Sequence, residues 1–131
     1  MTKELIISII IVVLIFLGNS ITENYTQESI DETTRNLTTL REEIIKSQDE
    51  VKVDIAKEKI NNIYGQWNLR YEKLAYYIEH DELEKVKTEL TGLKGYIEEE
   101  EYSEAVPELD KSIYILEHIK DKTALNLKNI F

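Results

Sequence analysis

The chain begins with an apolar segment that differs from everything after it. Residues 5–22 carry no charge between Glu4 and Glu23, and residues 5–17 are apolar apart from Ser8. As an α-helix with a rise of ~1.5 Å per residue, this uncharged run covers about 27 Å, close to the ~30 Å hydrocarbon thickness of a bilayer. The run therefore predicts a transmembrane helix over residues 5–22.

Two other interpretations of the apolar segment compete with a retained anchor. Its most apolar part has the length of a signal-peptide core, and Gly18 and Ser20 are small residues at an acceptable distance for cleavage. Against cleavage, the charge of Lys3 is offset by that of Glu4, and no Ala-x-Ala follows. A buried core helix would need apolar cover on every side, which the amphipathic remainder of the chain cannot supply. We therefore favour a retained anchor.

After the apolar segment, apolar positions recur at steps of three and four residues almost to the end of the chain. This spacing places them on one face of a helix and is typical of helices that pack side by side in a bundle. The four sets are Ile30, Leu37, Leu40, Ile44 and Val51, with Thr33 and Ser47 between them; Ile60, Tyr64, Trp67, Tyr71, Leu74 and Ile78; Leu83, Val86, Leu90, Leu93 and Ile97; and Val106, Leu109, Ile113 and Leu116. The pattern predicts an all-α fold, in which an N-terminal transmembrane helix is followed by an antiparallel bundle of three to four helices.

Local start signals place the predicted bundle helices near residues 24–46, 49–79, 82–100 and 103–120. Ser47 to Glu50 and Asp81 to Glu84 resemble capping boxes, and Ser103 can cap the last helix with Pro107 in its first turn. No Pro or Gly forces a break near residues 47–49, so the first two helices could also be one long rod. A linker of only a few residues is expected between the anchor and the bundle.

The charges that flank the apolar segment predict its orientation. Lys3 and the amino terminus precede the segment, whereas only acidic charges follow it before the first arginine, Arg35. The positive-inside bias then places the N-terminus in the cytoplasm and the rest of the chain outside. The expected layout is a short cytoplasmic N-terminus at residues 1–4, an anchor at 5–22 and an acidic extracytoplasmic helical bundle at 23–131. This describes a single-pass protein of the cell membrane.

Composition narrows the range of partners for the bundle. The chain has a net charge of −10, with 4 Gly, 1 Pro and no Cys. An acidic surface argues against nucleic-acid binding and against a second, peripheral membrane contact. The scarcity of turn residues argues against a β fold, and without Cys there is neither a disulfide nor a lipid-modified Cys.

Two Glu-His pairs are the sharpest candidates for a chemical site. Glu79-His80 and Glu117-His118 close two similar ten-residue segments and would lie near the same end of an up-and-down bundle. Two carboxylates and two imidazoles there could bind a metal such as Zn²⁺. The competing interpretation is that each His meets the helix dipole and caps carbonyls near a helix C-terminus. Adjacent side chains also point about 100° apart on a helix, which disfavours a chelate shared by neighbouring Glu and His. We expect no cofactor, and we keep the metal site as an alternative.

Aromatic residues are frequent in the predicted second helix. Tyr64, Trp67 and Tyr71 fall on its apolar face and are expected in the core. Tyr76 and Tyr77 form a candidate interaction surface, which could line a groove for a partner helix or a ligand. The sequence shows no Ser-His-acid spacing and no phosphate loop, so we expect a protein that is not an enzyme.

Several motifs together carry a resemblance to a known family. They are the N-terminal apolar run, Trp67, and the segments Tyr77-Ile-Glu-His-Asp-Glu-Leu83, Leu93-Lys-Gly-Tyr-Ile97, Leu116-Glu-His-Ile119 and Leu125-Asn-Leu-Lys-Asn-Ile-Phe131. In these the chain resembles a group of small bacterial proteins known as the domain of unknown function 4363 family, seen mainly in spore-forming Firmicutes. The resemblance covers most of the chain. It implies a single membrane anchor and an all-helical domain, and it implies no catalytic residue.

These features predict an accessory or scaffold subunit that binds another membrane or envelope protein, with homo-oligomers left open. The first alternative is a sensory or small-ligand-binding bundle that uses the Tyr76–Tyr77 region and the end with His80 and His118. It would need a membrane partner, because residues 1–4 leave no room for an output domain. The second alternative is a metal-binding protein that uses the two Glu-His pairs.

Overall fold

Four helices make up the described part of the protein. The computed structural model describes residues 1–46 and 52–130, with side chains up to residue 125, and these ranges contain no strand. The helices are α1 (Thr2–Lys46), α2 (Val53–Leu74), α3 (His80–Glu98) and α4 (Tyr102–Ile130). The predicted all-α fold with an apolar N-terminal helix is confirmed.

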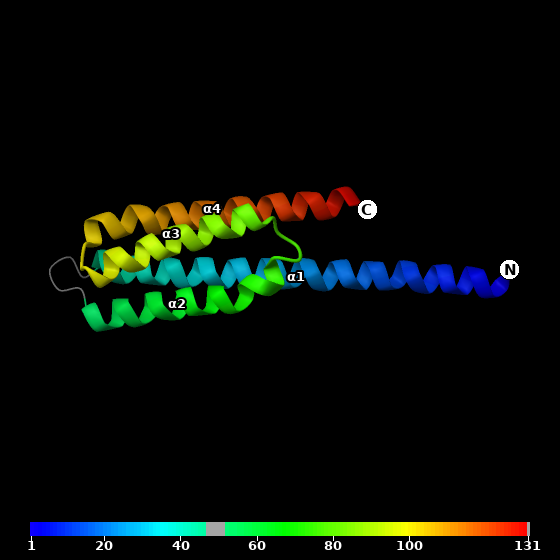
Figure 1. Ribbon diagram of the computed structural model, residues 1–131, viewed down its shortest axis with the longest axis horizontal. Helices are drawn as coiled ribbons and strands as arrows, with labels where there is room; N and C mark the ends of the chain where they lie inside the picture. The colour runs from blue at the N-terminus through cyan, green and yellow to red at the C-terminus, as the bar shows by residue number, and fades with distance from the viewer. Residues whose placement is uncertain (47–51, 131) are drawn as a thin grey trace.

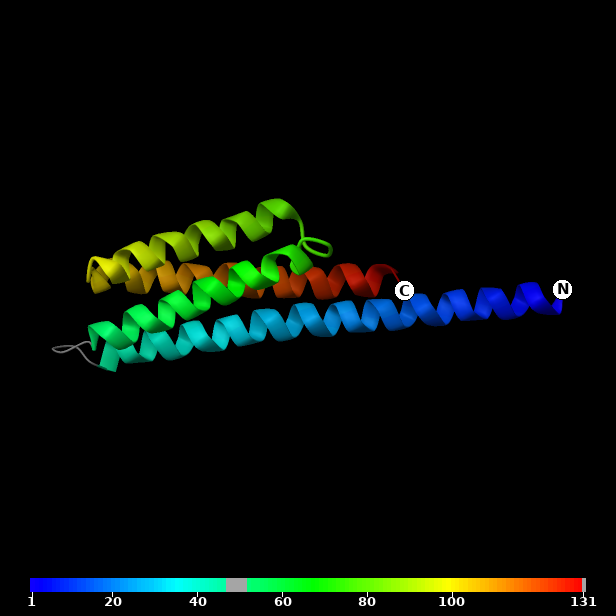
Figure 2. The ribbon, with the colours of Figure 1, turned by 60° about the horizontal axis from the view of Figure 1, so that its bottom comes forward.

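The helices form a bundle in which each helix runs back along the one before it (Figure 1). α1 packs against α2 and α4, and α3 packs against the same two helices, so α1 and α3 occupy opposite corners. The N-terminal part of α1 projects beyond the bundle without cover from the other helices (Figures 1 and 2). The α2–α3 turn and the end of α4 lie at the end of the bundle from which α1 projects, whereas the α3–α4 turn lies at the far end.

The apolar segment and the first bundle helix are one unbroken helix. α1 runs for 45 residues from Thr2 to Lys46, so the linker that we expected after residue 22 does not exist. Small polar residues pass through this region without ending the helix, and the Thr22 hydroxyl is satisfied within it by donating to the Gly18 carbonyl at 2.7 Å. The direction of the bundle is thereby tied to the direction of the apolar segment.

The boundaries of α2 and α3 differ from the sequence-based prediction. α1 and α2 are separate helices that pack against each other, which rules out one long rod. α2 ends at Leu74 instead of near residue 79, and the Ser47–Glu50 capping box lies outside the described residues. α3 begins at His80, with Glu79 as an N-cap that makes no side-chain capping bond. The predicted Asp81–Glu84 capping box therefore does not form.

α4 begins earlier and ends later than predicted. It spans Tyr102–Ile130 and so continues about three turns beyond residue 120. Ser103 lies inside the helix and is not its cap. Pro107 falls in the second turn, where it cannot donate a backbone hydrogen bond to the Ser103 carbonyl. One helical hydrogen bond is therefore missing at this position.

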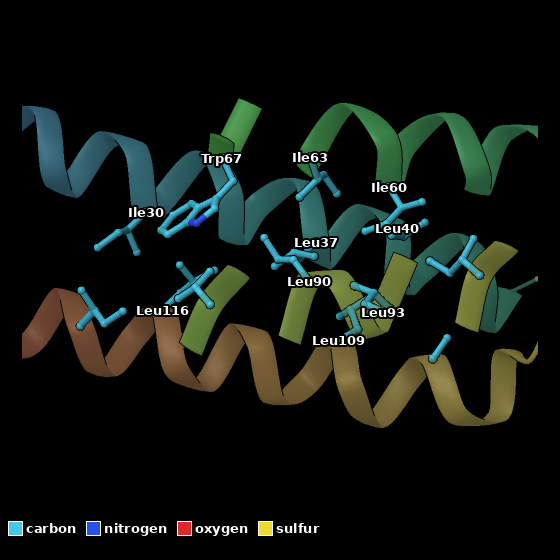
Figure 3. Close-up of a cluster of buried hydrophobic side chains, with 14 of the residues drawn as sticks. Ile30, Leu37, Leu40, Ile60, Ile63, Trp67, Leu90, Leu93, Leu109 and Leu116 are labelled. Atoms are coloured by element: carbon cyan, nitrogen blue, oxygen red, sulfur yellow. The ribbon is translucent and has the colours of Figure 1, made fainter. Parts of the chain in front are cut away.

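The predicted apolar faces meet in one core that receives side chains from all four helices (Figure 3). Trp67 is fully buried beside Ile30 of α1, and Tyr64 and Tyr71 pack at the edge of the core. The other seam residues that are buried are Thr33, Leu37, Leu40, Ile44, Ile60, Leu74, Ile78, Leu83, Val86, Leu90, Leu93, Ile97, Leu109 and Leu116. Full burial of each large apolar side chain contributes about 1.5–3 kcal/mol. The three- and four-residue spacing thus identified the core correctly.

Candidate functional site

The α2–α3 turn, residues 75–79, presents two tyrosines to the outside. Its backbone is held by Tyr77 N–H, which donates to the Leu74 carbonyl at 3.0 Å, and by Ile78 N–H, which donates to the same carbonyl at 2.8 Å. Ile78 is buried beneath the turn, whereas the exposed fractions of Tyr76 and Tyr77 are 83% and 50%. The buried Ile78 and the backbone hydrogen bonds therefore hold the turn in place, and the rings of Tyr76 and Tyr77 remain available to a partner.

A cluster of polar side chains joins the last turn of α2 to the first turns of α3. The Tyr71 hydroxyl donates to Glu84 Oε1 at 2.5 Å and lies 3.1 Å from His80 Nδ1. Because the single hydroxyl proton goes to Glu84, the Nδ1–H of His80 donates to the phenol oxygen. Burial and the neighbouring Glu84 carboxylate raise the pKa of Tyr71 to about 12. Tyr71 thus stays neutral and acts as a structural donor.

The two Glu-His pairs do not come together. Glu79 and Glu82 share the ammonium of Lys122, at 3.7 Å and 3.0 Å, while His80 belongs to the Tyr71 cluster. Glu117 and His118 are exposed on α4, where His118 lines a shallow hollow of about 180 Å³ between α3 and α4. Within residues 1–46 and 52–130, no three His, Asp or Glu side chains lie close enough to hold a metal. The alternative metal site therefore has no geometric support in this part of the chain.

Two carboxyl groups that sequence reasoning missed, those of Glu89 and Glu108, lie side by side between α3 and α4. A hydrogen bond from Glu89 to Glu108, followed by burial, raises the pKa of the Glu89 carboxyl, and the same bond lowers the pKa of the Glu108 carboxyl. The Lys111 ammonium lies 3.2 Å from Glu108 and 3.4 Å from Glu89. The only signal in the sequence was that both acids flank an apolar seam. Their pairing depends on the register of two helices, which the sequence did not show.

Ion pairs report how α1 is aligned with its two neighbours. They join Arg70 to Glu32 at 2.5 Å, Lys120 to Asp31 at 2.7 Å and Arg41 to Asp110 at 2.7 Å. The Arg70 guanidinium also donates to the Ser29 carbonyl at 3.2 Å, and it holds the pKa of the Glu32 carboxyl below its usual value. Exposed pairs of this kind stabilise a fold by about 0–1 kcal/mol each. These ion pairs therefore contribute little stability, but they show which residues of the neighbouring helices lie at the same level as each part of α1.

The side of α2 that faces away from the core is free of charge over three turns. No charged residue lies between Lys59 and Arg70. The exposed positions in this stretch form the α2 outer face, which consists of Asn61, Asn62, Gly65, Gln66, Asn68 and Leu69. Leu69 has an exposed fraction of 81%, and a Cβ added at Gly65 would have no atom of the chain within 4 Å. This face was not predicted from the sequence, where its signal is the lack of charged residues between Lys59 and Arg70.

The N-terminal part of α1 is the only segment in the described residues with the length and hydropathy of a membrane span. Only 6% of its most apolar 18-residue window is buried by the rest of the protein. Side chains from Leu5 to Leu17 are exposed on all sides of the helix. This excludes the buried core helix, because no other helix covers the segment. A single apolar helix of this kind is what a membrane anchor or a signal sequence requires.

Comparison with known proteins places the bundle in a family. The family model described as "Domain of unknown function (DUF4363)" matches residues 21–130, which begin where the uncharged run ends and include all of α2, α3 and α4. Neither the curated proteins nor the solved structures contain a match to the chain. Because the family model matches most of the chain, the protein belongs to the DUF4363 family, as its sequence motifs indicated.

Proposed function

We propose that the protein is a membrane-anchored accessory subunit, without enzymatic activity, that binds another membrane or envelope protein through the α2 outer face. α1 anchors it, and the bundle lies on the extracytoplasmic side. The α2 outer face is the observation that supports binding most directly. On a protein with a net charge of −10, a neutral partner would bury unpaired charges at most places on the surface. At the α2 outer face it would bury none.

The composition of the α2 outer face fits a contact with protein. The centres of interfaces are depleted in charged residues, and buried anchors there come from large side chains such as the exposed Leu69. Beside the face lies a shallow hollow of about 320 Å³, lined by Asn62 and Gln66 together with Asn36 and Thr39 of α1, and also by the charged side chains of Glu32 and Lys59. The amide and hydroxyl groups there can form hydrogen bonds with a partner, while Glu32 and Lys59 are already held in ion pairs with Arg70 and Glu43.

Gly65 gives a second reason to expect close approach by a partner. Gly in the middle of a helix costs about 1 kcal/mol relative to Ala. No atom of the described residues lies within 4 Å of a Cβ added at Gly65, which is also true at Gly95, so what distinguishes Gly65 is its place on the uncharged α2 outer face. A neighbouring helix that crosses α2 at this point would explain the glycine, because small residues let two backbones approach closely.

The test is site-specific photocrosslinking in membranes of the producing cells. A photoreactive amino acid at position 69 should form an adduct with a different protein, and the same amino acid at exposed Thr88 of α3 should not. The Gly65→Leu variant should abolish the adduct without lowering thermal stability. Gly95→Leu is its matched control, because the added side chain at Gly95 also meets open space. Adducts only with a second copy of the chain, or equal adducts at positions 69 and 88, would overturn the proposal.

A further inference from the structure

We propose that the base of the bundle rests in the lipid–water interface of the membrane that α1 crosses. The base is defined as the α2–α3 turn (residues 75–79) and the last turn of α4. The domain would then touch the membrane at a second place, through Tyr76, Tyr77 and the end of α4. This inference depends on the proposed membrane anchor, and it does not depend on the protein partner at the α2 outer face.

The continuity of α1 determines which part of the bundle faces the membrane. Because α1 has no linker between its apolar segment and the bundle, the bundle cannot swing away from the span on a flexible joint. The α2–α3 turn and the end of α4 lie on the side from which the span projects (Figures 1 and 2). Any bilayer around the span is therefore next to these two elements.

Contacts between α1 and α2 give the height of the turn above the span. The Arg70 guanidinium bonds to the Ser29 carbonyl, and one turn further along α2 the Lys73 ammonium lies 5.2 Å from the centre of the Tyr25 ring. Each turn of α2 thus moves about one turn down α1 toward the span. The turn that follows α2, in which the Tyr77 N–H donates back to the Leu74 carbonyl, lies at the end of the bundle from which α1 projects.

Contacts between α1 and α4 also place the end of α4, which extends further toward the span than the α2–α3 turn does (Figures 1 and 2). Asp110 pairs with Arg41 and Lys120 pairs with Asp31, so the two antiparallel helices advance by equal numbers of residues between the two pairs. An equal step beyond Lys120 leads to Ile130 on α4 and to Ile21 on α1. α4, which remains helical through Ile130, therefore reaches the edge of the uncharged run.

The exposed side chains of the base suit this position. Tyrosine is enriched where a bilayer meets water, because its ring is apolar and its hydroxyl can bond to head groups or water. Tyr76 and Tyr77 are exposed to 83% and 50%, and Leu125 near the end of α4 to 60%.

The distribution of charge weakens the objection that an acidic protein should avoid lipid, although the exposed Asp81 follows close after the turn. The acidic run Glu98–Glu101 lies at the α3–α4 turn, at the far end of the bundle from the span. At the base, residues 75–78 carry no charge, and Glu79 pairs with Lys122. The net charge of the whole chain argued against a peripheral membrane contact. That charge is a sum over both ends of the bundle and does not describe the base alone.

The chain contains no Cys, so single-cysteine labelling of the full-length protein tests this inference directly. Ala75→Cys places a fluorophore on the exposed turn while keeping both tyrosines, Glu99→Cys labels the far end, and Leu14→Cys labels the span. The purified variants are reconstituted in phosphatidylcholine–phosphatidylglycerol vesicles that contain brominated lipid, which quenches only nearby fluorophores. We expect strong quenching at position 14, at least about twofold weaker but clear quenching at 75, and none at 99.

Matched substitutions separate lipid contact from mere proximity. In the Ala75→Cys protein, replacing Tyr76 and Tyr77 by Ser should reduce quenching, whereas Tyr114→Ser should not, because Tyr114 is equally exposed but lies well above the base. Quenching at 14 with no more at 75 than at 99 would overturn the interfacial base and leave the anchor intact. No quenching at position 14 would overturn the anchor and, with it, both proposals. Since no other protein is present, a protein partner cannot produce the quenching at 75.

Discussion

At the scale of single residues, Glu100 occupies a conformation that is unfavourable for its type. It has a φ of 59°, in the left-handed region, in the turn between α3 and α4. There the Glu101 N–H donates to the Tyr96 carbonyl at 2.8 Å and the Glu100 N–H to the Ile97 carbonyl at 3.1 Å. These two bonds define a Schellman ending, whose left-handed position is usually glycine. A side chain with a Cβ costs about 1–2 kcal/mol in that conformation.

Replacing Glu100 by Gly should therefore stabilise the protein. The gain should be about 0.5–1 kcal/mol, because relief of strain exceeds the extra freedom that Gly gives the unfolded chain. Thermal unfolding of the full-length protein in detergent, followed by circular dichroism, should show a melting temperature higher by a few degrees. The control is Glu99→Gly, which should lower the melting temperature because Glu99 has a φ of −86° and gains nothing from glycine. An equal shift for both variants would contradict the argument.

Trp67 combines full burial with an unsatisfied donor. Its exposed fraction is 0%, and its indole Nε1 has no hydrogen-bond partner among the described residues. Trp67→Ala should lower the free energy of unfolding by about 3–5 kcal/mol through the cavity it leaves. Trp67→Phe should cost less than about 1.5 kcal/mol, because removal of the unpaired N–H offsets part of the lost packing. Chemical denaturation measures both values, and a loss for Phe equal to that for Ala would show that the indole N–H is satisfied.

At the scale of helices, periodicity predicted the core but not the lengths of the elements. Leu37, Leu90 and Leu109 were identified because helix packing requires apolar residues every three or four positions. The continuity of α1 was missed because periodicity does not show whether an apolar helix and the amphipathic helix that follows it are joined as one. Contacts such as Tyr71 with His80 were not predictable, since they depend on where a turn places the start of the next helix.

The Glu89–Glu108 pair makes the α3–α4 packing sensitive to pH. The pKa of Glu89 is raised in the folded state above the ordinary glutamate value of 4.5. Between these two pKa values, the folded state therefore binds more protons than the unfolded state. Stability from this group is therefore present below pH 4.5 and is lost as the pH rises through the folded pKa. The lowered pKa of Glu108 acts in a separate window below 4.5, where stability is lost as the pH falls.

Glu89→Gln should remove the loss of stability on the alkaline side of pH 4.5. The amide can still donate to the Glu108 carboxylate, and it cannot ionise, so the difference in unfolding free energy between variant and wild type should grow in favour of the variant as the pH rises. Denaturation curves at a series of pH values between 4.5 and 8 measure this difference. A difference in unfolding free energy that is constant over this range would show that folding does not raise the pKa of Glu89.

At the scale of the whole molecule, one helix belongs to both halves of the protein. The first part of α1 is exposed and apolar, while its second part supplies Ile30, Leu37 and Leu40 to the core. No joint therefore separates the apolar segment from the bundle. The family match begins at residue 21, near the end of the uncharged run, and covers the second part of α1 and the other three helices.

The same continuity makes the retained anchor and its orientation testable with two single cysteines. Glu99→Cys lies at the far end of the bundle, and Thr2→Cys precedes the apolar run. A maleimide reagent that cannot cross membranes should label position 99 in intact cells and position 2 only after the cells are opened, because Lys3 favours a cytoplasmic N-terminus. Mass spectrometry of the extracted protein should still find residues 1–22, since cleavage would remove the first turns of a helix that the bundle continues. Labelling at position 2 in intact cells would show that the N-terminus lies outside, opposite to the predicted orientation. A mature chain that begins just after Gly18 or Ser20 would identify the segment as a cleaved signal.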